Sequence, residues 1–156
     1  VWQGSPTYLR DRTRSLPLAA FRPLAEIPGV SLVSLQFGKG SEQLLLPDLG
    51  FSVATLPDDV DTTSGAFMDT AAIVQNLDLV IAADTSINHL CGALGVPSWV
   101  LLHLSPDWRW MLDREDSPWY PSVKLIRQRT YDDWQELLQR TANQLAALVA
   151  AKTRSP

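Results

Sequence analysis

An apolar run that ends in Asp-Thr-Ser and passes at once into a helical pattern is the feature that most limits the folds open to this chain. The run covers residues 79–83, and the helix that follows begins at Thr85 and is ended by Gly95 and Pro97. A buried strand leading directly into a helix is typical of α/β proteins. At such a helix start the first N–H groups have no helical partner and the peptide dipoles leave partial positive charge. The pattern therefore predicts a turn that suits an anion such as phosphate.

The side chains at this turn have two interpretations. Asp84, Thr85 and Ser86 bring a carboxylate and two hydroxyls to the helix start, and His89 follows on the same face of the helix. In the first interpretation Thr85 or Ser86 caps the helix and Asp84 braces its first turn, which is the ordinary role of such residues. In the second, these residues surround a bound phosphate. Taken alone, the local sequence favours the cap.

Composition predicts a globular domain with an acidic charge balance. The 156 residues suffice for one domain with a proper core, and 46% apolar with 19% charged residues is typical of soluble proteins. A net charge of -4 and a pI near 5.0 argue against a nucleic-acid partner, which requires a basic surface. No apolar run approaches the ~20 residues that span a bilayer, and no signal peptide is visible. We therefore expect a cytoplasmic protein without a membrane span.

Strands and helices alternate along the chain. The expected strands cover residues 1–2, 30–35, 53–56, 79–83, 98–102 and 123–126. The expected helices cover residues 17–26, a short segment ending near 46, and residues 66–76, 85–94 and 131–152. Such alternation implies a Rossmann-like, parallel six-stranded sheet with helices on both faces, in a single domain over residues 1–156. If the strand order is 3-2-1-4-5-6, the loops after strands one and four meet at the point where such sheets bind ligands.

The loop after the first strand is rich in arginine. Arg10, Arg12 and Arg14 alternate along it, with Asp11 between the first two. Guanidinium groups beside a helix start suit a diphosphate, because each offers paired charged hydrogen bonds. The alternative is a solvated loop whose charges pair with one another.

Two further polar residues follow the second expected strand. Gln36 can present its amide to a ribose or a base, and Lys39 can reach a phosphate, although a plain surface turn explains both equally well. His89 and His103 lack further ligands at metal-binding spacings. No glycine-rich GxGxxG fingerprint follows the first strand, which argues against a dinucleotide-dependent dehydrogenase.

A long aromatic loop covers residues 104–122. It carries Trp108, Trp110, Trp119 and Tyr120 among charged residues. Loops of this length in compact domains are usually functional or interfacial. The aromatic side chains either stack on a sugar or base or anchor a second domain, and we favour this packing role.

Five segments of the chain resemble the C-terminal half of bacterial glycosyltransferases of the heptosyltransferase-like family 9, in the branch that follows tetratricopeptide (TPR) repeats: VWQGSP, DRTRSLPL, VSLQFG, LDLVIAADTSINHLCGALGVPSWVLL and PDWRWMLDREDSPWYPSVKLIRQ. The resemblance covers nearly the whole chain. It implies a GT-B architecture, in which two Rossmann-like domains face each other and the C-terminal one holds the nucleotide-sugar donor. The chain would then be a fragment that lacks the N-terminal domain and any TPR repeats.

The resemblance also implies roles for several of the residues singled out above. It places residues 84–86 against the diphosphate and the sugar, with His89 supporting that turn. It places Arg12 or Arg14 against phosphate and Gln36 near the ribose, although relatives usually offer lysine and an acidic residue at these two places.

The implied reaction moves a sugar from a nucleoside diphosphate to a hydroxyl of a glycan or protein acceptor. The donor is a substrate, and neither a cofactor nor a metal is expected, because helix-end N–H groups and basic side chains stabilise the departing diphosphate. The general base belongs to the absent N-terminal domain, so this chain alone is expected to bind donor without catalysis. Two alternatives remain: a non-catalytic binding or scaffold module of a TPR protein, and a nucleotide-sugar epimerase.

Overall fold

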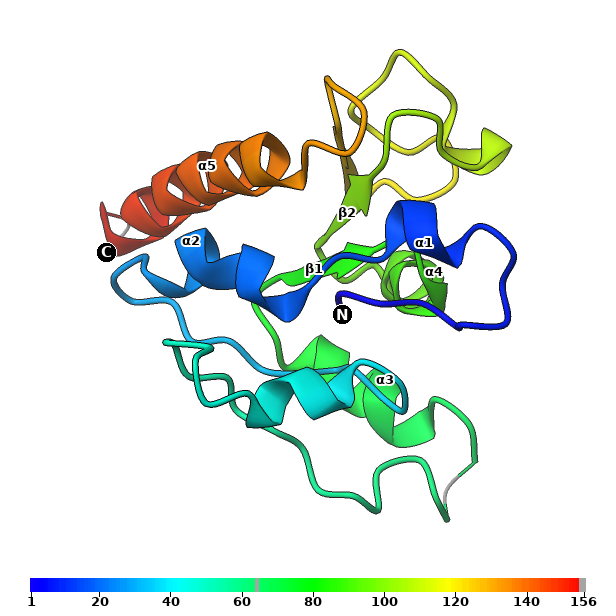
Figure 1. The fold of residues 1–156 in the computed structure, drawn as a ribbon, viewed down its shortest axis with the longest axis vertical. Helices are drawn as coiled ribbons and strands as arrows, with labels where there is room; N and C mark the ends of the chain where they lie inside the picture. Colours follow the sequence, from blue (N-terminus) through cyan, green and yellow to red (C-terminus); the bar gives the residue numbers. More distant parts are fainter. Residues whose placement is uncertain (64, 155–156) are drawn as a thin grey trace.

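Three parallel strands form the centre of the molecule in the computed structural model, which describes residues 1–63 and 65–154. They are β1 (Val80–Ala83), β2 (Ser98–Leu102) and β3 (Val123–Arg127), and they lie in the order β1-β2-β3. The register pairs Val80 with Ser98 and Ser98 with Val123. All three strands come from the second half of the chain, and the long helix α5 lies along one side of them (Figure 1).

The helices differ greatly in length. The longer ones are α3 (Met68–Gln75), α4 (Ser86–Leu94) and α5 (Trp134–Arg154). The one-turn α-helices are α1 (Asp11–Arg14) and α2 (Arg22–Ala25). The 3-10 helices are η1 (Leu18–Phe21), η2 (Ser41–Leu45) and η3 (Trp108–Trp110). None of the helices in the described part of the chain is both long enough and apolar enough to pass through a bilayer.

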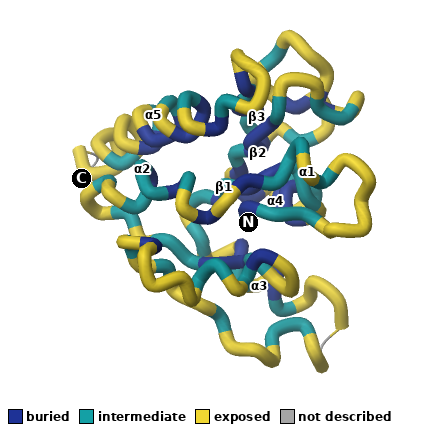
Figure 2. The backbone as a smooth tube through the Cα atoms, in the orientation of Figure 1, coloured by how far each residue is buried: buried dark blue, intermediate teal, exposed yellow. Residues whose placement is uncertain are grey.

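The core lies on both faces of the sheet because successive strand residues point to opposite sides. Ala83, Leu101 and Ile126 face the buried side chains of η1, α2 and α5. The opposite face has two parts: β1 packs there with α3 and α4, and β2 and β3 pack there with Trp110 of the aromatic loop. Figure 2 shows the buried residues gathered around the strands, with exposed loops outside them.

The expected six-stranded Rossmann-like sheet, which was to correspond to the C-terminal half of a GT-B enzyme, is wrong. The sheet has three strands, and the segments 1–2, 30–35 and 53–56 do not join it as strands. Residues 30–35 and 53–56 meet only at an isolated parallel bridge between Val33 and Ala54. The architecture is therefore a small α/β domain with a three-stranded parallel sheet.

A side chain takes the place of the missing backbone ladder. The Gln36 side-chain oxygen accepts hydrogen bonds from the backbone N–H groups of Trp2 and Gln3, both at 3.1 Å. The first residues of the chain also contact β1, where the Val1 carbonyl accepts a hydrogen bond from the N–H of Ala83 at 2.9 Å. The start of the chain thus lies beside β1, but a side-chain amide links it to residues 30–36. Burial of residues 30–35 and 53–56 is only partial, because Ser34 and Leu35 are buried whereas Ser31, Ala54 and Thr55 are exposed. Strand pairing also requires continuous backbone partners, which these segments lack.

Candidate functional site

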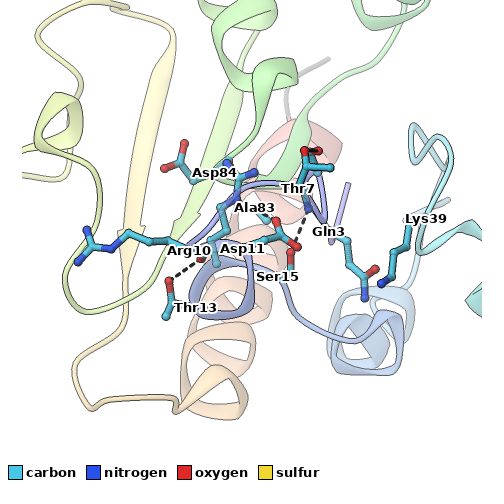
Figure 3. A network of polar contacts seen from close by, with 12 residues as sticks. Gln3, Thr7, Arg10, Asp11, Thr13, Ser15, Lys39, Ala83 and Asp84 are labelled. Atoms are coloured by element: carbon cyan, nitrogen blue, oxygen red, sulfur yellow. Dashed lines mark hydrogen bonds and ion pairs between the residues drawn. The ribbon is translucent and has the colours of Figure 1, made fainter.

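Polar and charged side chains gather where β1 and β2 end. Asp84 follows β1, and His103 follows β2 at nearly the same height, because Ala83 pairs with Leu101. Arg14 of α1 reaches the same place, where its Nη1 donates to the backbone carbonyl of Asp84 at 2.7 Å. We call Arg10, Arg14, Asp84, Thr85 and His103 the polar edge. The arginine loop and the Asp-Thr-Ser turn, 70 residues apart in the chain, therefore meet as expected (Figure 3).

Arg14 is held firmly at the polar edge. Its Nε lies 3.1 Å from Asp11 Oδ1, its guanidinium lies 4.4 Å from the centre of the Tyr8 ring, and its side chain is only 16% exposed. Gly4 makes room for it, since a Cβ at that position would lie 2.3 Å from Arg14 Nη2. The cation is preorganised, but the Asp84 carbonyl and the Asp11 carboxylate already use part of its hydrogen-bonding capacity.

Thr85 is the N-cap residue of α4, but its side chain does not cap the helix. Its backbone is extended, with φ -140 and ψ 172, and no N–H of the first turn donates to its hydroxyl. The Thr85 Oγ1 atom is buried, and no partner for it exists among the described residues. Because buried polar atoms are nearly always hydrogen-bonded, this hydroxyl suits a ligand atom. The capping interpretation therefore does not hold for Thr85, and Ser86 beside it is exposed.

His103, for which the sequence shows no metal-binding partners, belongs to the polar edge. Burial lowers its pKa from the usual value of 6.5; the negative charge of Asp84 opposes this shift, and Arg10 and Arg14 add to it. The imidazole is therefore mainly neutral at pH 7 and can donate or accept a hydrogen bond. The sequence does carry one signal for this role. His103 is the first residue after the buried strand 98–102, and that strand ends beside the strand that is followed by Asp84.

The two other arginines of the loop are exposed. Arg12 lies in α1, and Arg10 precedes that helix and extends away from it (Figure 3). Neither forms an ion pair with any residue that the structure describes. Of the two, Arg10 lies close enough to His103 to influence its pKa.

Gln36 and Lys39 lie outside the polar edge. Gln36 is fully engaged, because besides accepting two N–H groups it donates to the carbonyls of Gln3 at 3.2 Å and Lys39 at 2.9 Å. Lys39 is exposed and lies near Gln3, well apart from Asp84 (Figure 3). Gln36 therefore joins two segments of the fold.

His89 faces the aromatic loop. Its Nδ1 lies 3.2 Å from the Tyr120 hydroxyl, and its ring stacks on Trp110 with 5.2 Å between ring centres. The neighbouring Asn88, which the sequence analysis does not single out, is fully buried. It joins α4 to β1 and β2, because its side chain donates to the Ala83 carbonyl at 2.6 Å and accepts from the Ser98 hydroxyl at 3.2 Å. Both residues fix the direction in which α4 leaves the polar edge.

The aromatic loop divides into a buried and an exposed part. Trp110 is 0% exposed, whereas Trp108 and Trp119 are 71% and 53% exposed and meet edge to face at 6.3 Å. Trp110 packs against the sheet of this domain, which is neither of the two expected roles. The exposed pair leaves a stacking surface beside Arg109, whose guanidinium lies 5.3 Å from the centre of the Trp108 ring.

Metal and thiol chemistry find no support in the part of the chain that the structure describes. No group of three or more metal-binding side chains comes together there. Cys91 is buried, and burial raises the pKa of its thiol to about 11. Cys91 is therefore a packing residue, since the thiolate and not the thiol is the nucleophile.

Comparison with known proteins finds one similar sequence of note. The chain is 31% identical, over 153 residues, to a protein named FlbA from Caulobacter vibrioides. The match covers 97% of this chain and 25% of FlbA, so the chain spans about a quarter of the length of that relative. No family model and no solved structure matches the chain.

Proposed function

We propose that the polar edge binds the diphosphate of a nucleoside-diphosphate sugar, and that the chain is the donor-binding domain of a metal-independent glycosyltransferase. The observation that carries this proposal is the buried Thr85 hydroxyl without a partner, at the start of a nine-residue helix and beside the Arg14–Asp84 contact. The resemblance of residues 79–97 to family 9 glycosyltransferases supports the same ligand.

The geometry suits a leaving diphosphate. Negative charge grows on that group as the glycosidic bond breaks, and preorganised donors stabilise it most when they lie in a partly buried site. Here the donors are the first N–H groups of α4, the Thr85 hydroxyl and the guanidinium groups of Arg14 and Arg10. The overall charge of -4 does not oppose local binding of an anion, because charges beyond about 10 Å are largely screened at physiological salt.

In this proposal, other domains of a longer protein supply the groups of the reaction that this chain lacks. The base that activates the acceptor hydroxyl is contributed by a further domain, and the acceptor is a glycan or a protein. The match to a quarter of FlbA supports a longer parent chain. This domain alone then binds donor but transfers no sugar.

Calorimetric titration with UDP, GDP and ADP tests the proposal. We expect heat with at least one of the three diphosphates and none with the matching free nucleoside, because the diphosphate supplies the charge. A flat trace with all three, at high micromolar protein, contradicts the proposal.

The Arg14→Ala variant is expected to bind the preferred diphosphate about tenfold or more weakly. A hydrogen bond to a charged group contributes about 1.5–3 kcal/mol, and the Arg14 side chain at the polar edge is only 16% exposed. Arg12→Ala is the matched control, because Arg12 lies in the same short helix but is exposed. Equal affinities of the two variants for the diphosphate would show that Arg14 does not bind it.

The Thr85→Val variant separates binding from folding. Valine keeps the shape of threonine and removes the buried hydroxyl that lacks a partner, so we expect unchanged or slightly higher thermal stability. We expect diphosphate binding to weaken about five- to tenfold, the value of one hydrogen bond of about 1–1.4 kcal/mol. A lower melting temperature with unchanged affinity for the diphosphate would show that the role of Thr85 is purely structural.

A scaffold role is the second candidate. The observation that favours it is the engagement of Arg14 and Gln36 by protein atoms, which leaves less capacity for a ligand. A scaffold of this kind gives no calorimetric signal with any nucleotide, so the same titration separates the two functions.

A further inference from the structure

Gln128 lies at the end of β3, on the side of the sheet where the polar edge lies. Its N–H donates to the Leu102 carbonyl at 2.8 Å, so the ladder between β2 and β3 continues to this residue. Leu101 pairs with Ile126, and the next residues on the same face are His103 and Gln128. The Gln128 side chain is therefore the neighbour of the His103 imidazole.

The residue in the corresponding place after β1 is Thr85. One row of buried side chains crosses the three strands on the face toward α5: Ala83, Leu101 and Ile126. Two positions further along the chain, each member of this row is followed by a polar residue: Thr85, His103 and Gln128. Polar side chains thus continue from the polar edge to the end of β3.

The Gln128 side chain is buried and has a hydrogen-bond donor without a partner. It is only 4% exposed, and its Oε1 accepts from the N–H of Leu104 at 3.2 Å. This contact fixes the orientation of the amide, because only the oxygen of an amide accepts from an N–H. The Nε2 atom is buried, and no acceptor for it exists among the described residues. Since such an orphaned donor is costly, it suits an oxygen atom of a ligand, as the Thr85 hydroxyl does.

The Gln128 amide lies where the core meets the surface. Leu104 is 46% exposed, and residues 129–132, which follow Gln128 directly, are exposed as well. His103 beside it is partly buried and mainly neutral at pH 7. An amide donor beside a neutral imidazole suits a hydroxyl group, which accepts from the first and forms a hydrogen bond with the second. A phosphate oxygen is bound more strongly by a charged donor such as Arg14.

We propose that His103 and Gln128 form a subsite for a sugar hydroxyl of the nucleotide sugar whose diphosphate is bound at the polar edge. In this subsite Gln128 Nε2 donates to the hydroxyl oxygen. The inference rests on the proposed function and adds β3 to the strands whose ends contact the ligand. A nucleoside-diphosphate sugar has hydroxyls on both sides of its diphosphate, on the ribose and on the transferred sugar.

The side-chain amide signals of Gln128 in the ¹⁵N-labelled chain test the subsite directly. The probes are UDP, GDP and ADP and their glucose conjugates. We expect a saturable shift of the Gln128 signals with at least one of them. A shift with the diphosphate itself assigns the subsite to the ribose, and a shift with the glucose conjugate alone assigns it to the transferred sugar. The Gln36 amide is the internal control, because its donors already bond to the carbonyls of Gln3 and Lys39.

The Gln128→Met variant measures the contribution of the amide to binding. Methionine has a similar length and removes the donor, so we expect the ligand that shifts Gln128 to bind about five- to tenfold more weakly. Gln139→Met is the matched control, because Gln139 lies on α5 and is exposed. We expect this variant to bind as tightly as the parent chain.

The outcomes separate this inference from the proposed function. If the parent chain binds one of the probes while the Gln128 signals stay in place, the inference is overturned and the diphosphate site stands. The same holds if Gln128→Met binds that probe as tightly as Gln139→Met does. If the parent chain binds none of the probes, the proposed function fails and the inference fails with it.

Discussion

Replacing Trp110 by alanine is expected to lower the free energy of unfolding by about 3–5 kcal/mol. Trp110 is fully buried and packs on the β2–β3 face of the sheet against residues such as Val100 and Leu125. Its ring also stacks on His89 of α4. Alanine leaves a cavity under the aromatic loop and removes this contact, so the loop loses its anchor to the sheet.

Trp108→Ala is the matched control for this variant. Trp108 lies in the same 3-10 helix but is 71% exposed, so we expect a loss below about 1 kcal/mol. Urea unfolding of both variants measures the difference. Similar losses in the two variants would mean that the loop is not anchored by Trp110.

The second effect is a rise in the free energy of unfolding as the pH increases through the range in which the His103 imidazole titrates. Burial lowers the pKa of this group below its usual value of 6.5, so in that range the unfolded chain binds more protons than the folded chain. The free energy of unfolding therefore increases as the pH rises toward about 6.5.

The His103→Asn variant isolates this effect, because asparagine does not titrate. We expect the variant to gain less stability than the parent chain as the pH rises toward about 7, in urea unfolding at unit pH steps. Equal gains in both chains would show that folding does not change the pKa of His103.

The second half of the fold could be predicted from sequence because its elements carry strong local patterns. The apolar runs at 79–83, 98–102 and 123–126 are the three strands of the sheet, and the helices expected at 85–94 and 131–152 are α4 and α5. The segments 30–35 and 53–56 have similar apolar patterns, yet they form only one bridge. Strand pairing depends on distant partners, which a local pattern does not encode.

The site could be predicted in part for a related reason. The meeting of the arginine loop with the Asp-Thr-Ser turn was expected from a six-stranded sheet that does not form. Arg14 nevertheless contacts Asp84, because the start of the chain lies beside β1. The engagement of Gln36 could not be foreseen, because its partners Trp2 and Gln3 lie 34 and 33 residues away. His103 is marked only by its position directly after a buried strand, because a single histidine forms no motif of its own.

A titration of the ¹⁵N-labelled chain with UDP, GDP and ADP, followed by the backbone amide signals, tests directly whether the polar edge binds a diphosphate. We expect saturable shifts at Thr85, Ser86 and Ile87, the first N–H groups of α4 and its cap, with at least one diphosphate. The matching nucleoside is predicted to leave these signals in place. Shifts confined to other parts of the chain, or none with any of the three diphosphates, would contradict a diphosphate site at the polar edge.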